Sequence, residues 1–364
     1  MSENALRLLE QVGEIPTAPL HELGVAIYVT GVLRDLGLPP VVDEFGNLIA
    51  TYRQGDTTPV ALVAHLDHPG LEIVDVESRS RAEASLLGGV RSTCFDRPVP
   101  VKLFGESGPQ SATIVGYAVD ATTGRVSRLD LEYSGRLAVG DFGIFDLPGF
   151  ERTGDQVAMR AADDLAGVAA VLATMTRLVE SGAPGVVHAV FTRAEEIGLV
   201  GAILVAEGRQ LPPSTIVISL ECSRELPGAE PGLGPVIRVG DRSRAFHPDG
   251  EALLLTARDR LSGLPIQRQL MSGGTCEASA FGLMGYRTTG VALPLVNYHN
   301  VGPGDVISPE QINVNDYLGE IELLVAAVGA SVLPAASTAQ LRWLQSVEQF
   351  RPRLQSTAAD YRSL

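Results

Sequence analysis

The stretch GVVHAVFTRAEEIGLVGA, residues 185–202, joins a run of apolar and β-branched residues to two adjacent glutamates, Glu195 and Glu196. The run at residues 185–192 follows Pro184, and its composition predicts a buried strand. The two glutamates therefore stand where this strand leaves the core. Because like charges in contact repel by about a few kcal/mol at the edge of a protein, the pair implies either full solvation or a bound cation.

The composition is that of a folded globular protein. The chain has 364 residues, of which 45% are hydrophobic and 20% charged, so we expect two domains or one large domain with an insertion. The net charge of −15 argues against nucleic acid or an anionic membrane as a partner, since both require a basic surface. Three cysteines, Cys94, Cys222 and Cys276, have no metal-binding spacing and favour a reducing compartment.

No targeting or membrane segment is expected. The first residues, MSENALRLLEQVGE, lack the basic region and apolar core of a signal peptide, which predicts a cytoplasmic location. The longest apolar stretch, residues 323–333, is shorter than the ~20 residues that a membrane helix needs. It is predicted to be a buried helix.

Alternating helices and strands dominate both ends of the chain. Residues 5–38 show helical spacing in two pieces separated near Pro16 and Pro19, and residues 59–67, PVALVAHLD, have the continuous apolar character of a parallel strand. Further along, residues 163–182 and 313–333 are predicted helices, and residues 214–221 a strand. This alternation predicts an α/β domain with a mixed, mostly parallel sheet flanked by helices.

A segment with a different residue pattern interrupts this alternation of helices and strands. From Leu71 onward, short alternating segments are separated by Gly, Pro, Ser and Asp without a helical period, which predicts a small all-β module. We expect a discontinuous α/β catalytic domain at residues 1–71 and 156–333, a β-barrel-like insertion domain at 72–155, and a C-terminal helical tail at 334–364.

Carboxylates and imidazoles collect where the predicted strands end, which is where open α/β sheets bind ligands. Taken alone, each has an ordinary explanation, such as an Asp that caps a helix or a hydrogen-bonded histidine. Together they favour a cation, because buried carboxylates are normally paired or metal-bound. The candidate residues are His65, Asp67, Asp163, Asp164, Glu195, Glu196, Glu221 and His299.

Mixed imidazole and carboxylate ligands suit Zn²⁺ or a similar first-row ion better than Ca²⁺. The carboxylates outnumber what one zinc ion uses, which suggests two ions about 3.5–4 Å apart that share a carboxylate and a hydroxide. Adjacent residues of an extended strand point in opposite directions. Glu195 and Glu196 can therefore divide two tasks, one as a metal ligand and the other as a general base.

Six motifs, taken in order, resemble the glutamyl aminopeptidase family, whose members include tetrahedral, dodecameric aminopeptidases with a zinc-exopeptidase-like fold. The likeness extends from residue 5 to about residue 330, includes the β insertion, and is most specific in FTRAEEIGLVGA. The motifs are AHLDHPG (64–70), AADDLAG (161–167), FTRAEEIGLVGA (191–202), ISLE (218–221), GGT (273–275) and NYHN (297–300).

The resemblance implies an aminopeptidase that acts on peptides with a free N-terminus. It implies a homo-oligomer built from dimers, up to a dodecamer, and two divalent ions, zinc or else cobalt or manganese. It also implies a cis peptide bond between Asp163 and Asp164. The roles that it implies are His65, Asp163 and Glu221 on one ion, Asp163, Glu196 and His299 on the other, Glu195 as general base, and Asp67 as the acceptor of the other His65 N–H.

Three positions depart from the family pattern. Glu221 stands where aspartate is usual, Leu165 where arginine often follows the aspartate pair, and Cys276 where aspartate often follows GGT. Two other functions remain open, a dimetal deacylase or carboxypeptidase and a weakly catalytic metal-binding assembly protein. His68 and His247 are predicted to be surface or pocket-lining histidines rather than ligands.

Overall fold

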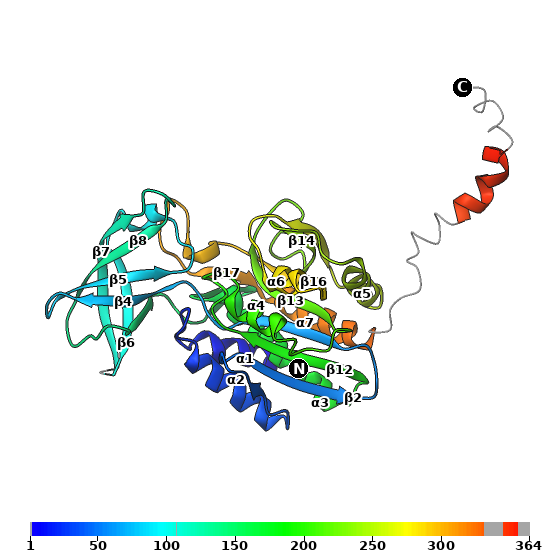
Figure 1. Cartoon of the computed structure of the whole chain (residues 1–364), viewed down its shortest axis with the longest axis horizontal. Coiled ribbons are helices and arrows are strands. Elements are labelled where there is room, and N and C mark those ends of the chain that lie inside the picture. Colours follow the sequence, from blue (N-terminus) through cyan, green and yellow to red (C-terminus); the bar gives the residue numbers. More distant parts are fainter. Residues whose placement is uncertain (1, 107, 331–344, 356–364) are drawn as a thin grey trace.

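The computed structural model describes residues 2–106, 108–330 and 345–355, which form an α/β layer structure with a β-barrel beside it (Figure 1). The α/β part is built on an eight-stranded sheet. The neighbouring strands, in order, are β1 (Val41–Val42), β2 (Leu48–Gln54), β12 (Gly185–Thr192), β3 (Val60–His65), β13 (Ile216–Arg224), β16 (Arg287–Leu295), β14 (Val236–Asp241) and β15 (Gln267–Met271).

The centre of this sheet is parallel. Strand β3 lies between β12 and β13, and β16 lies beyond β13, all running in the same direction. Strand β2 pairs antiparallel with β12, and β14 pairs antiparallel with β16 but parallel with β15. The mixed, mostly parallel sheet expected from the sequence is therefore confirmed.

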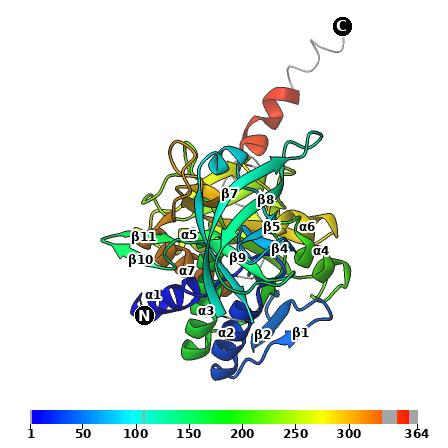
Figure 2. The same cartoon turned by 90° about the vertical axis from the view of Figure 1, so that its left-hand side faces the viewer.

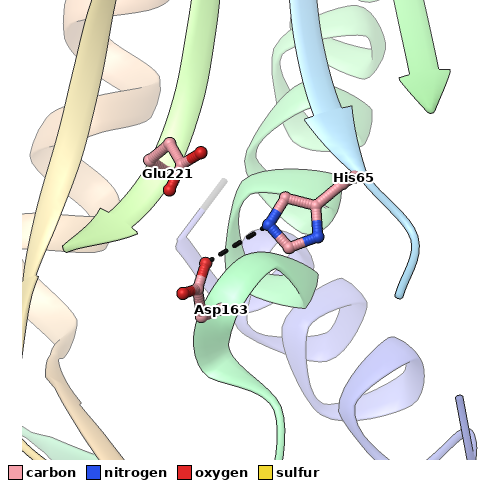
Figure 3. Close-up of side chains that lie close together, drawn as sticks. All are labelled: His65, Asp163 and Glu221. Carbon is pink, nitrogen blue, oxygen red and sulfur yellow. Dashed lines mark ion pairs between the residues drawn. The ribbon is translucent and has the colours of Figure 1, made fainter. Parts of the chain in front are cut away.

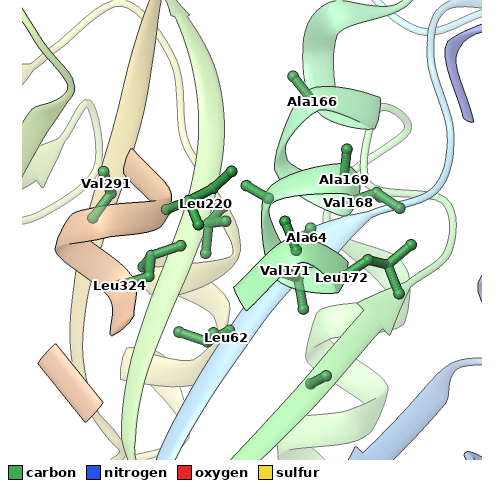
Figure 4. Close-up of a cluster of buried hydrophobic side chains, with 14 of the residues drawn as sticks. Leu62, Ala64, Ala166, Val168, Ala169, Val171, Leu172, Leu220, Val291 and Leu324 are labelled. Atoms are coloured by element: carbon green, nitrogen blue, oxygen red, sulfur yellow. The ribbon is translucent and has the colours of Figure 1, made fainter. Parts of the chain in front are cut away.

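Helices cover both faces of the sheet. One face packs against α1 (Ser2–Gly13), α2 (Leu23–Asp35), α3 (Ala162–Ser181), α5 (Pro248–Asp259) and α7 (Val314–Gly329). The other face packs against α4 (Val200–Glu207) and α6 (Glu277–Leu283). Every residue of β3 is buried, with Leu62 and Ala64 toward α3 (Figure 4) and Ala61 and Val63 toward the opposite layer. This two-sided burial explains why the strand has no polar alternation.

The barrel is closed and has its own apolar core. It forms between β3 and the return of the chain to the α/β part, and faces the viewer in Figure 2. The short helix η1 (Ser92–Phe95) follows its second strand. In order around the barrel the strands are β4 (Gly70–Val76), β5 (Arg81–Leu87), β8 (Val126–Tyr133), β7 (Gly108–Val119), β6 (Val99–Gly105) and β9 (Phe142–Phe145).

A separate three-stranded sheet leads back to the α/β part. It contains β10 (Glu151–Thr153), β11 (Gln156–Met159) and β17 (Glu310–Asn313), with β11 in the middle. Strand β11 leads into α3 and β17 into α7, and the short helix η2 (Tyr298–Asn300) lies between β16 and β17. We expected the candidate ligands at the strand ends of the open α/β sheet, but Asp163 instead starts α3 after β11 of this separate sheet.

The division into residues 1–71 with 156–333, 72–155 and 334–364 stays a prediction. The predicted tail lies largely outside the described residues, and of it residues 345–355 form a helix with exposed side chains. None of the helices in the described ranges has the length and apolar character that a membrane crossing requires.

Candidate metal centre

The candidate residues meet at the carboxyl ends of the parallel strands. His65 is the last residue of β3, and Glu195 and Glu196 follow β12 directly. Glu221 lies in β13, while Asp163 stands in the first turn of α3. Parallel strands bring such ends to one edge of the sheet, so residues far apart in the sequence become neighbours.

One group of possible ligands contains His65, Asp163 and Glu221 (Figure 3). His65 Nε2 lies 3.4 Å from Asp163 Oδ1, and one ligand atom from each residue falls within 4.8 Å of the others. All three side chains are buried. This group has the residue types and the spacing of a site for a divalent cation.

A second group contains Asp163, Glu196 and His299. His299 Nε2 lies 3.3 Å from Glu196 Oε2 and 3.8 Å from Asp163 Oδ2. The two oxygens of Asp163 therefore face different histidines, Oδ1 toward His65 and Oδ2 toward His299. A carboxylate in this position can bridge two cations.

Glu195 lies beside the first group. Its Oε2 is 4.0 Å from His65 Nε2, and its side chain is 11% exposed. Glu195, Glu196 and His65 form a third set whose possible ligand atoms lie within 4.8 Å of one another. The two adjacent glutamates thus enter the same cluster, and neither extends into open solvent.

Asp67 organises this cluster differently from the expectation. His65 Nδ1 donates to the Asp67 backbone oxygen at 3.1 Å, and the Asp67 Oδ1 atom is 3.6 Å from the same nitrogen. The carboxylate instead accepts the backbone N–H groups of Glu195 and Glu196, each at 3.0 Å. Asp67 therefore orients His65 through its main chain and the glutamate pair through its side chain.

The electrostatics of the cluster favour a cation. Burial, followed by the charge of nearby carboxylates, raises the pKa values of Glu196 and Glu221 well above the usual range. Burial also raises the pKa of Glu195, opposed by His65 and reinforced by Glu221 and Glu196. Among the described residues, three buried oxygens in the two groups lack a hydrogen-bond partner: Asp163 Oδ1, Glu196 Oε1 and Glu221 Oε1. Because unpaired buried oxygens are costly, this donor set fits divalent metal ions.

The chain between Asp163 and Asp164 has the expected cis peptide bond. The alternative role of these aspartates as helix caps is not realised, since no side chain makes a capping hydrogen bond at the start of α3. Asp164 is fully buried next to Gly167 and belongs to neither ligand group.

Glu310, in β17, is a site residue that the sequence did not indicate. It is fully buried, and its carboxylate accepts the backbone N–H groups of Asp163 at 2.9 Å and His299 at 2.8 Å. It therefore joins residues of both ligand groups. Its local sequence, PEQIN, carries no motif, and only the pairing of β17 with β11 brings it to the site.

His68 and His247, whose roles the sequence left undecided, lie in different surroundings. His68 is buried below the site, where its ring contacts the Asp163 backbone oxygen at 2.5 Å and Asn300 Oδ1 at 2.9 Å. Burial lowers the pKa of His68 to about 4. His247 is largely exposed at the start of α5, where its Nδ1 accepts the Asp249 N–H.

The three departures from the family pattern have distinct surroundings. Glu221 Oε2 lies 3.7 Å from Nη1 of the buried Arg238. Leu165 packs in the main core. Cys276 is buried, and its backbone N–H donates to Asp241 Oδ2 at 3.2 Å. An aspartate is therefore present near position 276, but it comes from the end of β14.

Comparison with known proteins places these observations in a family. A model of the M42 glutamyl aminopeptidase family matches residues 124–312, just over half of the chain. A protein of Acetivibrio thermocellus named "Putative aminopeptidase" is 26% identical in an alignment 304 residues long, which covers 79% of this chain and 87% of that protein.

Solved structures show the same fold. The Pyrococcus horikoshii TET1 peptidase has a TM-score of 0.74 at 23% identity, with 89% of this chain and 99% of that chain covered. The aminopeptidase APDkam598 of Desulfurococcus kamchatkensis has a TM-score of 0.75 at 20% identity, with coverage of 93% and 99%. Together with the family match, the site and the fold show that this chain belongs to the M42 glutamyl aminopeptidase family.

Proposed function

We propose that this protein is a metal-dependent aminopeptidase that hydrolyses the N-terminal peptide bond of peptides, with Glu195 as the general base. The observation that carries the proposal is the sharing of Asp163 by two ligand groups, one with His65 and Glu221 and the other with Glu196 and His299. The donor set suits two Zn²⁺ ions, with Co²⁺ or Mn²⁺ as alternatives.

Two bound divalent ions would lower the pKa of a shared water molecule and polarise the scissile carbonyl group. Glu195 would take a proton from that water and give it to the leaving amine. Its position beside His65 brings it within reach of the first ligand group, and its burial favours the protonated form that must exist between these two transfers.

The surrounding residues keep the reacting groups in place. The Asp67 carboxylate fixes the backbone of Glu195 and Glu196, so the two side chains can serve different tasks. The Glu310 carboxylate fixes the backbone of Asp163 and His299. Such outer contacts keep ligands and bases within the narrow limits of productive geometry.

The decisive experiment combines metal binding with substrate choice. Titration of the metal-free chain with Zn²⁺ should show two ions per subunit, and the loaded protein should hydrolyse aminoacyl anilides with a free amine. The same anilides with an acetylated amine should remain intact. Hydrolysis of only the acetylated set would instead indicate a deacylase, and two bound ions without hydrolysis of any substrate would indicate an assembly protein.

We also propose that the chain forms a homo-oligomer. Two structurally similar proteins support this proposal: the Pyrococcus horikoshii TET1 peptidase can assemble into a tetrahedron or a large octahedral shell, and PhTET1-12s is a dodecamer. Light scattering on the purified full chain tests the proposal. A mass of about one 38.4 kDa chain at micromolar concentration would refute it.

A further inference from the structure

The loop that carries His299 has an unusual backbone. Asn297, His299, Asn300 and Asp305 all have left-handed conformations, with φ angles of 61°, 55°, 60° and 54°. This conformation is unfavourable for residues other than glycine, although less so for asparagine and aspartate. A loop with several such residues requires contacts from its surroundings to stay in one conformation.

The α/β part supplies some of these contacts. Glu310 accepts the His299 backbone N–H at 2.8 Å. The Asn300 side chain donates to the Arg160 backbone oxygen at 2.8 Å and accepts from His68 at 2.9 Å. These bonds fix the main chain at His299 and Asn300, but they leave the rotation of the His299 imidazole ring undetermined.

The barrel supplies a hydrogen bond to the ring itself. His299 Nδ1 lies 2.6 Å from the backbone oxygen of Gly89, in the connection between β5 and η1. Because a carbonyl oxygen can only accept a hydrogen bond, Nδ1 must carry the proton. The lone pair then lies on Nε2, the atom that faces Glu196 and Asp163. This is the arrangement that a metal-ligating histidine requires.

A second set of barrel contacts holds the far end of the same loop. Thr93 Oγ1 donates to Asp305 Oδ2 at 2.8 Å, and Arg91 Nη1 lies 3.3 Å from Asp305 Oδ1. Val301 and Ile307 pack against the apolar core of the barrel. The His299 loop is therefore attached to the barrel at its ring, at its apolar side chains and at Asp305.

We propose that the barrel is a working part of the metal centre, in which Gly89, Thr93 and Asp305 are positioning residues that hold His299 ready to bind the second cation. This inference rests on the proposed function and goes beyond it, because it gives the insertion a role in the site of its own chain. The group of His65, Asp163 and Glu221 has no residue from this loop. The proposal therefore predicts that loss of the barrel contacts weakens the binding of the second ion only.

The test uses the full-length double variant Thr93→Val/Asp305→Asn. Valine has the shape of threonine without the hydroxyl group, and asparagine removes the charge while tolerating the left-handed backbone. The matched control is Glu132→Gln, which removes the exposed ion pair between Arg81 and Glu132 on the same barrel. A second variant, Asp305→Gly, removes the side chain at a φ angle that glycine adopts freely.

Isothermal titration of the metal-free proteins with Zn²⁺ gives the readout. The variant Glu196→Gln identifies the binding step that belongs to the second ion. For that step we expect an affinity loss of about tenfold in both Asp305 variants, at the lower end of the loss found when an outer partner of a ligand is removed. The affinity of the other binding step should change less than about twofold. The control variant should have wild-type affinity at both steps.

Either of two results overturns the proposal. Unchanged affinity for both ions in the Asp305 variants would show that the barrel contacts do not position His299, and equal weakening of both ions would show a general loss of structure. A failure of the proposed function looks different, because the wild type would then bind two ions without hydrolysing unblocked substrates. A wild-type protein that binds only one ion would refute both the proposed function and the proposed role of the barrel.

Discussion

Asp67 Oδ1 lies 3.0 Å from the backbone nitrogen of Glu195 and accepts its N–H. The second oxygen of the same carboxylate accepts the N–H of Glu196 at 3.0 Å. One fully buried side chain thus fixes the backbone of both glutamates that follow β12. This relationship explains how adjacent carboxylates can keep separate positions, one toward His299 and the other toward His65.

Asp67→Asn should therefore impair catalysis. An asparagine side chain has one acceptor oxygen, so one of the two backbone N–H groups would face an NH₂ group and the glutamate pair would shift. We expect kcat/KM on an aminoacyl anilide to fall by about 10- to 100-fold. Asp43→Asn is the control for the same substitution in a turn outside the site, where one oxygen, Oδ1, accepts both backbone N–H groups and asparagine can keep them. Equal activities of the two variants would contradict this role of Asp67.

Glu195→Gln should separate metal binding from turnover. The amide keeps the size of the side chain but cannot accept the proton of a water molecule, so we expect kcat to fall by about 10²- to 10⁴-fold. Zinc stoichiometry, measured by elemental analysis, should stay at the wild-type value. If the variant retains wild-type kcat, Glu195 is not the base.

The sequence predicted the residues that stand directly at strand ends. His65 and the glutamate pair follow continuous apolar runs, and parallel strands bring the ends of such runs together regardless of the loops between them. Glu310 was missed for the opposite reason. It reaches the site through the pairing of β11 with β17, and the short alternation of EQIN differs little from that of any edge strand.

The same contrast holds for the wider fold. The helices α3 and α7 were predicted because long apolar periodicity is a strong local signal. The segment between β13 and β16 was not assigned, although it forms β14, α5, β15 and α6. Of its strands, β15 lies at the edge of the sheet and alternates between exposed and half-buried residues, which is a weak sequence pattern. Strand β14, next to it, is mostly buried but has only six residues.

Removal of the metal ions should make stability depend on pH. Without cations, the raised pKa values of Glu195, Glu196 and Glu221 mean that the folded chain binds protons at a pH where the unfolded chain has released them. These three carboxylates should therefore stabilise the metal-free protein as the pH falls from 8 toward 5, whereas His68, with its pKa lowered to about 4 by burial, opposes them because the unfolded chain binds its proton first. Zinc should add about 2.7 kcal/mol per bound ion at a free concentration of 100 Kd and reduce this pH dependence. Denaturant unfolding at both pH values, with chelator and with zinc, measures both effects.

The same pH dependence of stability in the metal-free wild type and in Glu221→Gln would contradict this account. The cluster would then hold its carboxylates in ionised form without a cation. Such a result would also weaken the case for metal ions that rests on the unpaired oxygens of Asp163, Glu196 and Glu221.

A buried acid outside the site offers a separate test of the same physics. Glu320, in α7, is fully buried, and neither of its carboxylate oxygens has a hydrogen-bond partner among the described residues. Burial, and then the charge of Asp316, raises the pKa of Glu320 well above the usual range. Below the unfolded-state pKa of about 4.3 both states hold the proton, and above it only the folded state does, so this residue costs stability as the pH rises.

Glu320→Leu should therefore stabilise the protein at pH 8 by about 1–3 kcal/mol, the cost of an unsatisfied buried polar group, and by less at pH 4.5. Denaturant unfolding of the zinc-loaded chain at both pH values measures the difference. Glu10→Leu, at an exposed position of α1, is the control, and its effect should be small and independent of pH. Because Glu320 belongs to neither ligand group, zinc affinity should not change. A Glu320 variant that is less stable than the wild type at pH 8 would show that this carboxylate has a stabilising partner in the folded protein.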